Sequence, residues 1–233
     1  MASTKVMLML QYAYIHIEAP LDPVLFSTFL RQLPEAMQQK TLRFRRWQDQ
    51  NNHLFGKLLL ERLLVQQFHQ AEDCLLHLHS NEFGKPLLND QIHFNISHSD
   101  QMVVCMVSDE GPVGIDVERR KDFQVEDIKT FLRPEEFEAL QNDPTSEKFF
   151  DFWTKKEAIL KATGLGLTLD LKKVGLHGPK GYLFPPYDEW WHFHQLDLHP
   201  GYTTTYCTRE ERSTAQHIPL AALSAQFSRL EST

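Results

Sequence analysis

Hydrophobic and polar positions in the first half of the chain change period where the elements change. Residues 6–17 are largely apolar and predict a strand. Asp22 followed by Pro23 is typical of a helix start and predicts a short helix within residues 20–34. Between residues 46 and 70, apolar and polar residues alternate at the helical period, which predicts a long helix. The strands predicted after this helix are short: 75–78, 93–96 and 102–107.

The second half repeats this change from strand to helix patterns. Residues 109–112 are a strong turn signal, so the strand predicted at 113–118 is expected to form a hairpin with the strand before it. Gly164 ends the last helical pattern. Residues 172–208 have the pattern of strands separated by a loop. The helices predicted between these strands are 125–132, 134–140 and 146–162.

The order of the elements indicates the fold class. It is strand, helix and strands, and then strand, helices and strands. Two α+β halves of similar size, meeting near residue 110, would produce this order. We therefore predict an α+β fold with an N-terminal half over residues 1–110 and a C-terminal half over residues 111–233.

Composition excludes some classes of function. The 233 residues are 42% hydrophobic, which is enough for a sizeable core. The formal net charge of -7 argues against a general nucleic-acid binder, because such proteins usually carry a basic surface. Residues 6–17 favour a strand over a signal peptide, and no stretch approaches the ~18 apolar residues of a membrane span.

Cysteine and histidine positions give no metal site of their own. The three cysteines lack metal-ligand spacing and are odd in number, which suits a reducing cytosol and predicts a cytoplasmic protein. His77 and His79, and likewise His192 and His194, resemble ligand pairs on strands. With no cysteine or acid at consistent spacing, we interpret both pairs as surface histidines.

The candidate chemistry lies in two acidic segments about forty residues apart. Asp116 and Glu118 are two apart in a β-branched run, so a strand would point both carboxylates to the same side. Glu157 and Lys161 are one helical turn apart and share a helix face. Three carboxylates and a lysine could hold a hard divalent cation such as Mg²⁺ against a phosphate. This constellation indicates chemistry on a phosphorylated substrate.

Each of these residues also has a simpler interpretation. Asp116 and Glu118 could form the solvated face of a half-buried strand, and Glu157 could be an ordinary helix residue paired with Lys161. However, two carboxylates close together on one side repel each other unless a cation or a proton lies between them. The joint presence of all four residues therefore favours a metal site.

Three other segments carry groups that suit a phosphate. Ser97, His98 and Ser99 cluster where a strand emerges into a loop. Residues 83–86 form a fixed turn that carries a cation, although such turns are also common in plain loops. Three arginines within residues 43–46 oppose the helix macrodipole at a predicted helix start, which suggests an anionic partner.

Together these residues resemble the 4'-phosphopantetheinyl transferases of the large monomeric kind, often called Sfp-type. The resemblance runs from about Lys40 to Leu169. It implies two similar α/β halves related by a pseudo-twofold, each a small, mainly antiparallel sheet packed on a long helix, with coenzyme A in the cleft between them. The motifs that carry it occur in this order: Arg43-Phe44, Phe83-Gly84-Lys85-Pro86, Phe94-Asn95-Ile96-Ser97-His98-Ser99, Gly114-Ile115-Asp116-Val117-Glu118, and Trp153-Thr154-Lys155-Lys156-Glu157 with Lys161, Gly164 and Gly166.

The resemblance also implies an activity and a role for each site residue. The family transfers the phosphopantetheine arm of coenzyme A to a serine of an apo carrier protein or carrier domain and releases adenosine 3',5'-bisphosphate. Asp116, Glu118 and Glu157 would hold Mg²⁺, and Lys161 would contact the phosphate under attack. Glu157 is the first candidate for general base and Glu118 the second. The other residues implied to contact coenzyme A are Lys40, Arg43, His53, Lys85, Pro86, Ser97, His98 and Asp116.

Two features set this chain apart from the family pattern near the 3'-phosphate. His53 stands where some relatives carry a small hydroxyl residue, and the basic pair before Arg43 is incomplete, since Met37 and Gln39 flank Lys40. The carrier protein of this family is typically acidic, like this chain, so its recognition should be local. We expect docking on a basic and then apolar stretch: Arg119, Arg120, Lys121, Phe123, Phe131 and Leu132.

Two rival interpretations remain open on the sequence. An Asp-x-Glu motif with a later Glu and Lys also suits a metal-dependent nuclease or phosphodiesterase, although the acidic net charge counts against it. A non-catalytic module that binds coenzyme A or a carrier protein is the other, but a mere binder need not keep three acids and a lysine. Two halves in one chain favour a monomer, and neither a nucleic acid nor a membrane is expected as a partner.

Overall fold

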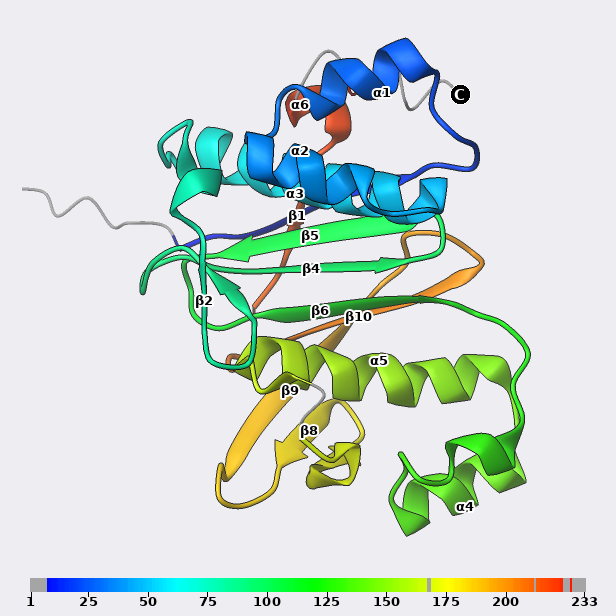
Figure 1. Ribbon diagram of the computed structural model, residues 1–233. Coiled ribbons are helices and arrows are strands. Elements are labelled where there is room, and N and C mark those ends of the chain that lie inside the picture. Colours follow the sequence, from blue (N-terminus) through cyan, green and yellow to red (C-terminus); the bar gives the residue numbers. More distant parts are fainter. Residues whose placement is uncertain (1–7, 167–168, 212, 224–226, 228–233) are drawn as a thin grey trace, which may run out of the picture.

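The protein is built from two main sheets, each packed on one long helix (Figure 1), and a small two-stranded sheet of β2 and β3. The computed structural model describes residues 8–166, 169–211, 213–223 and 227. All strand pairs within the described part are antiparallel except the pair of β1 and β11. The predicted α+β fold with two halves of this kind is therefore confirmed.

The first sheet has the order β11 (Gln216–His217), β1 (Leu10–His16), β5 (Met102–Ser108) and β4 (His93–Ser99). The second has the order β6 (Gly114–Arg119), β10 (Tyr202–Thr208), β9 (Glu189–Leu196), β8 (Lys180–Leu183) and β7 (Val174–His177).

The two halves share one strand order. In the first half, β1 is followed by helix α3 (Trp47–Gln66) and then by β4 and β5. In the second, β6 is followed by helix α5 (Ser146–Thr163) and, further on, by β9 and β10. In both, the last of these three strands pairs with the first on one side and with the second on the other. This repeat arises without any visible internal sequence repeat, so it comes from the order of elements rather than from their residues.

The predicted hairpin of β5 and β6 is wrong. β5 pairs with β1 on one side and with β4 on the other, while β6 pairs with β10. Both edges of β5 are therefore occupied, and the chain must leave the sheet after it. The carboxylate of Asp109, in the predicted turn, accepts a hydrogen bond from the backbone N–H of Met9. The turn thus fastens the end of β5 to β1 and passes the chain to the other sheet.

Several smaller elements refine the prediction. Asp22 caps helix α1 (Pro23–Leu30), accepting hydrogen bonds from two backbone N–H groups, as its position before Pro23 predicted. Residues 75–78, predicted as a strand, lie almost wholly in the 3-10 helix η1 (Cys74–His77). The helix predicted at 125–132 is only the 3-10 turn η2 (Val125–Ile128). Val6 and Met7, the start of the first predicted strand, lie outside the described residues. The remaining short elements are β2 (His79–Ser80), β3 (Pro86–Leu87), α4 (Pro134–Asn142), η4 (Leu171–Lys173) and α6 (Leu220–Leu223).

Helix α2 (Glu35–Leu42) has no counterpart in the sequence analysis. Thr41 is its buried residue, so the helix has no apolar stripe for a periodic pattern to show. Pro34 precedes it and makes no side-chain cap. Packing against α3 therefore stabilises it, as is usual for a short helix.

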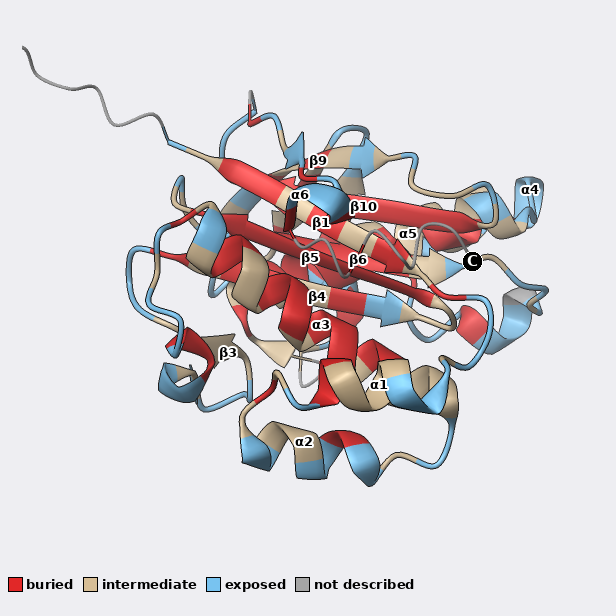
Figure 2. Ribbon diagram, turned by 90° about the horizontal axis from the view of Figure 1, so that it is seen from above, coloured by how far each residue is buried: buried red, intermediate tan, exposed pale blue. Residues whose placement is uncertain are grey.

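Buried residues lie along the strands and along one side of α3 (Figure 2), and two of the hydrophobic cores lie where α3 and α5 pack on their sheets. Leu54, Phe55 and Leu58 of α3 are fully buried in the first core. Leu223 and Phe227, from the end of the described chain, pack into this same core. The carbonyl of Leu223 also accepts a hydrogen bond from the side chain of Gln66. The end of the chain thus returns to the first sheet, where β11 lies beside β1. None of the helices within the described ranges is long and apolar enough to cross a membrane.

The two sheets meet where β4 lies beside β6. Alternate side chains of β4 accept hydrogen bonds from backbone N–H groups of β6. They are Asn95 with Ile115 at 3.0 Å, Ser97 with Val117 at 3.1 Å, and Ser99 with Arg119 at 3.1 Å. These polar side chains, rather than a backbone ladder, join β4 to β6 across the seam.

Helix α5 lies unusually close to β6. A Cβ atom at Gly114 would lie 2.0 Å from the carbonyl oxygen of Ala158 and 2.5 Å from the nitrogen of Ala162. Only glycine permits this approach. The close contact brings the face of α5 that carries Glu157 and Lys161 onto the strand that carries Asp116.

Candidate active site

Three carboxylates and one lysine converge at the seam between the sheets. Lys161 donates to Oδ1 of Asp116 at 2.5 Å and to Oγ of Ser97 at 2.8 Å. Asp116 is 2% exposed and Glu157 is 9% exposed. Besides burial, the charges of Asp116, Lys161 and Glu118 act on the pKa of Glu157. Glu118 therefore belongs to the same group. The structure thus brings together the four residues that the two acidic segments singled out.

Strand alternation explains the direction of the acids on β6. Ile115 and Val117 are fully buried in a core that includes Val104 of β5 and Tyr206 of β10. Successive side chains of a strand point to opposite faces, so the acidic positions between and after them face away from this core. The acids therefore turn toward α5 because their apolar neighbours are already committed to the other side.

Burial and the nearby charge of Asp116 favour protonation of Glu157 and Glu118. Burial and then the charge of Asp116 raise the pKa of Glu157 to about 7. The same two causes raise the pKa of Glu118 above its ordinary value. A lysine offsets only part of this charge, so the group retains negative charge that a proton or a cation can neutralise.

The group fits a hard divalent cation. Among the described residues, Oδ2 of Asp116 and Oε1 of Glu157 are buried oxygens without a hydrogen-bond partner. Carboxylate oxygens are the ligands that Mg²⁺ prefers, and a few of them suffice because the ion keeps water or phosphate oxygens as its other ligands. The surplus of negative charge and the free oxygens together make the three acids suitable Mg²⁺ ligands.

Two serines of β4 support the acids. Ser97 was expected at the rim of the cofactor site, and the structure places its Oγ 2.9 Å from Oδ1 of Asp116 and beside Lys161. Ser99 donates to Oε2 of Glu118 at 2.6 Å. Ser99 was not expected to contact the acids. The alternation of Asn95, Ser97 and Ser99 along one strand is the signal that could have shown it.

A second group, made of basic side chains, lies between α2, α3 and β4. Burial, followed by the charges of Lys57, Lys40 and His98, lowers the pKa of His53 to about 4. Burial and the charge of Lys40 also lower the pKa of Lys57. Nδ1 of His53 lies 2.7 Å from Oγ1 of Thr41, which fixes the ring against α2. Lys40, His53 and His98 were predicted here, whereas Lys57 was missed, although it follows His53 by one helical turn.

Arg43 and the turn that holds Lys85 take different positions. Arg43 is exposed at the end of α2, next to the basic group. Lys85 donates to the carbonyl of Ala162 at 2.7 Å, and burial lowers the pKa of Lys85 to about 8. Pro86 begins β3, opposite Ser80. The turn thus caps the carboxyl end of α5, where a cation is favourable.

The side chains of the expected carrier-docking stretch differ in their surroundings: some form ion pairs or hydrogen bonds, some are exposed and one is buried. Arg119 forms an ion pair with Asp100, and Arg120 donates to the backbone carbonyls of Pro200 and Tyr202. Lys121 is exposed, and so is Phe131, at 41%. Leu132 is 2% exposed in a small apolar core, so it does not belong to the surface.

An open hollow of about 630 Å³ lies beside these residues. Ser99, which holds Glu118, is part of its wall, so the hollow adjoins the acidic group. Its lining is mainly basic and comes from both halves: Arg46, Ser99, Asp100, Arg119, Arg120, Lys121 and Asp122.

Comparison with known proteins gives a consistent result. The model of the 4'-phosphopantetheinyl transferase superfamily matches residues 112–207, and the model of the N-terminal part of 4'-phosphopantetheinyl transferases matches residues 21–110. The chain is 32% identical over 166 residues to 4'-phosphopantetheinyl transferase gsp of Aneurinibacillus migulanus, covering 70% of this chain and 69% of that one. It is 29% identical over 202 residues to 4'-phosphopantetheinyl transferase Sfp of Bacillus subtilis, covering 83% and 89%.

Proposed function

Because this chain belongs to the 4'-phosphopantetheinyl transferase superfamily and transfers the 4'-phosphopantetheine arm of coenzyme A to carrier proteins, we propose that its reaction centre is the group of Asp116, Glu118, Glu157 and Lys161. The observation that carries the proposal is the surplus of buried carboxylates around one lysine, at the seam between the sheets. Family membership also decides between the interpretations that the sequence left open. It confirms the transferase and sets aside the nuclease and the non-catalytic module.

We assign Mg²⁺ to Asp116, Glu118 and Glu157. Its support is the negative charge of the three acids and the free oxygens of Asp116 and Glu157 in the described structure. When bound, the ion would neutralise charge on the pyrophosphate of coenzyme A. The protein's own part is to hold the three acids in place, through Ser97 on Asp116 and Ser99 on Glu118.

The residues of the chain account for the proton and for the charge of the reaction. The carrier serine Oγ forms a bond to the phosphorus next to the pantetheine, and the bond from this phosphorus to the bridging oxygen breaks. Adenosine 3',5'-bisphosphate leaves with the electron pair. Glu157 takes the serine proton, directly or through water, because its carboxylate lies beside the other acids and Lys161. Glu118 is the second candidate. Lys161 donates to the phosphate under attack.

We assign the 3'-phosphate of coenzyme A to the basic group of the first half. Lys57, Lys40 and His98 act electrostatically on His53, and Lys40 acts on Lys57, so a dianion placed among them would offset this positive charge. Arg43 lies at the edge of this group. Lys85 and Pro86 would then face the adenine side, as the family resemblance implies.

We place the carrier protein at the hollow beside Ser99. Lys121 is exposed there and Phe131 lies on the loop that follows, whereas Arg120 is held by backbone carbonyls. Lys121→Glu should raise the KM for the carrier about tenfold, the effect of losing ~1.4 kcal/mol of interaction, and leave the KM for coenzyme A unchanged. Lys173→Glu, at the far edge of the second sheet, is the matched control. An unchanged carrier KM in Lys121→Glu would refute this placement.

The remaining assignments follow from the same reaction. We propose a boundary between the halves at residues 110 and 111, with the active site in the cleft between them. We also propose a monomeric enzyme that binds no nucleic acid. Three buried cysteines without disulfides and a coenzyme A substrate support a cytoplasmic location.

The direct test of the function is a mass measurement. The protein is incubated with coenzyme A, Mg²⁺ and a panel of apo carrier proteins. A gain of ~340 Da on one serine, the size of the transferred arm, is the expected result. A chelator should abolish the gain, and added Mg²⁺ should restore it. No gain on any carrier in the panel would contradict the transfer of the arm to carrier proteins.

A further inference from the structure

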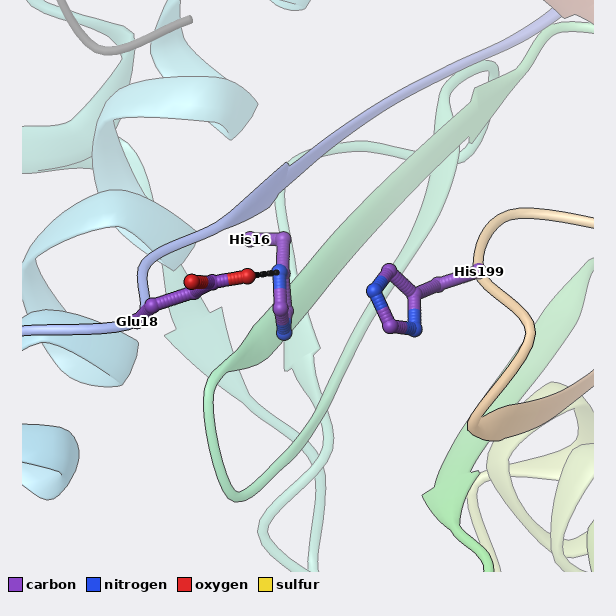
Figure 3. A group of neighbouring side chains, drawn as sticks. All are labelled: His16, Glu18 and His199. Atoms are coloured by element: carbon purple, nitrogen blue, oxygen red, sulfur yellow. Dashed lines mark ion pairs between the residues drawn. The ribbon is translucent and has the colours of Figure 1, made fainter. Parts of the chain in front are cut away.

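A second group of potential metal ligands lies between the end of β1 and the turn from β9 to β10, and it is formed by His16, Glu18 and His199 (Figure 3). His16 ends β1, Glu18 follows it, and His199 lies in the turn between β9 and β10. One ligand atom of each lies within 4.8 Å of those of the other two. Nδ1 of His16 is 3.6 Å from Oε1 of Glu18, and the two histidine rings are 4.4 Å apart between centroids. In Figure 3, one ring nitrogen of His199 points toward His16.

Backbone and side-chain hydrogen bonds hold the three residues together from both halves. Gln101 accepts from the N–H of Ile17 at 3.0 Å, and its side chain donates to the carbonyl of Glu18 at 2.9 Å. The N–H of Gln101 in turn points at the hydroxyl of Tyr202, at 3.4 Å. Tyr202 donates its own N–H to the carbonyl of His199 at 3.0 Å. The group is therefore built by the fold and not by chance rotamers on a loop.

The donor types distinguish this group from the three acids at the reaction centre. Two imidazoles and one carboxylate suit borderline ions such as Zn²⁺, whereas Mg²⁺ prefers oxygen ligands alone. Burial, and then the neighbouring His199, lower the pKa of His16. A neutral imidazole keeps the lone pair that a metal needs, so no proton has to be displaced from His16 at neutral pH.

We propose that His16, Glu18 and His199 form a binding site for one divalent transition-metal ion, for which Zn²⁺ is the probe, and that the ion joins β1 of the first half to the β9–β10 turn of the second. Two histidines and one carboxylate supply three ligands, and water completes a tetrahedral shell. The site does not depend on the proposed reaction centre.

Two adjustments set the strength of the site. Ligand atoms around Zn²⁺ lie roughly 3–3.5 Å apart, given metal bonds of ~2.0–2.1 Å, so the carboxylate must move inward. Glu18 can do so because its side chain is 77% exposed. The N–H of Gly201 donates to Nδ1 of His199 at 3.2 Å. If Nε2 of His199 binds the metal, the ring proton must lie on Nδ1. Nδ1 can then no longer accept the hydrogen bond from Gly201. We therefore expect micromolar affinity, weaker than that of structural zinc sites.

Zinc titration of ligand variants tests the proposal. Zn²⁺ is added to the full chain in an excess of Mg²⁺, which keeps the hard-ligand site occupied, and binding is followed by calorimetry. His199→Gln should weaken the strongest Zn²⁺ equivalent at least ~10-fold, and Glu18→Gln should weaken it less. His77→Gln is the control. Nε2 of His77 also lies beside a carboxylate, 3.2 Å from Asp73, but no third ligand is near it in the described structure.

Thermal unfolding provides a second readout. Zn²⁺ should raise the Tm of the wild type and of His77→Gln but not that of His199→Gln, because only the first two retain the link between the halves. Circular dichroism and transfer activity with Mg²⁺ show that each variant is folded. Equal Zn²⁺ affinity and equal Tm shifts in wild type and His199→Gln would overturn the proposal. So would a loss in His77→Gln as large as the loss in His199→Gln.

Discussion

Two lysines of α5, five residues apart, each meet a buried carboxylate, but their surroundings differ. Lys156 is 1% exposed and uses its three donors on Oε2 of Glu136 and on the carbonyls of Leu171 and Val174, at 2.8 to 3.0 Å. Lys161 is 27% exposed and has two partners, Asp116 and Ser97. The first lysine is sealed and its charge is balanced. The second stands open among three acids.

The difference shows which property marks a reaction centre. A buried carboxylate oxygen without a partner occurs at both places, since Oε1 of Glu136 has none in the described part of the chain and neither has Oδ2 of Asp116. A free oxygen is therefore not sufficient evidence for a metal. The surplus of negative charge is different, because one lysine faces one acid at Lys156 and three acids at Lys161. An unbalanced and accessible group can take up a cation, and a balanced one cannot.

The largest effect that tests this comparison is on stability. Lys156→Met leaves Glu136 as an uncompensated buried charge and should destabilise the fold by about 3–5 kcal/mol. Urea unfolding measures the change. The double variant Lys156→Met with Glu136→Leu should recover most of the loss, because an apolar pair of similar volume replaces the ion pair. Lys161→Met should change the stability less and the transfer rate more. The comparison fails if the two lysine variants unfold alike.

The next effect is on turnover. Glu157→Gln keeps the size of the side chain but removes the base, so kcat should fall at least ~100-fold, the usual scale of acid–base catalysis. Coenzyme A binding should be partly retained, because the basic group of the first half is untouched. Steady-state kinetics with a saturating apo carrier measure the first quantity and calorimetry the second. A kcat near that of the wild type would remove Glu157 from the proposed proton transfer.

Lys57 extends the comparison to a third lysine, one with basic neighbours. Burial and then the charge of Lys40 disfavour the charged form of Lys57 in the free protein, so Lys57→Met should stabilise the fold slightly. In the same variant, the preference for coenzyme A over 3'-dephospho-coenzyme A should fall about tenfold, which corresponds to ~1.4 kcal/mol. The ratio of kcat/KM for the two substrates measures this preference. An unchanged ratio would exclude Lys57 from the 3'-phosphate site, while transfer by the wild type itself would still stand.

The sequence predicted what depends on a single element. Asp116 and Glu118 lie on the same side because side chains alternate along a strand. Glu157 and Lys161 lie on the same face because residues four apart on a helix are neighbours. The sequence could not predict the partners of β5, because strand pairing depends on which strand edges in the folded sheet are still unpaired. It also could not separate Lys156 from Lys161, since only the tertiary structure supplies the carbonyls that saturate Lys156. The two-half order was visible because it lies in the succession of elements.

The smallest effect concerns acid stability and His53. This histidine has a pKa of about 4 in the folded protein and 6.5 as its ordinary value. Between these two pH values the unfolded chain binds more protons, so the stability from neutral His53 is complete above pH 6.5 and is lost as the pH falls toward 4. The ring is partly exposed, and with solvent screening the loss should be only about 1–2 kcal/mol. His53→Asn keeps a polar group near Thr41 and should remove this part of the acid sensitivity, whereas His77→Asn should not. Urea midpoints at low and neutral pH measure it, and equal pH dependence in wild type and His53→Asn would show that burial and the basic neighbours do not hold His53 neutral.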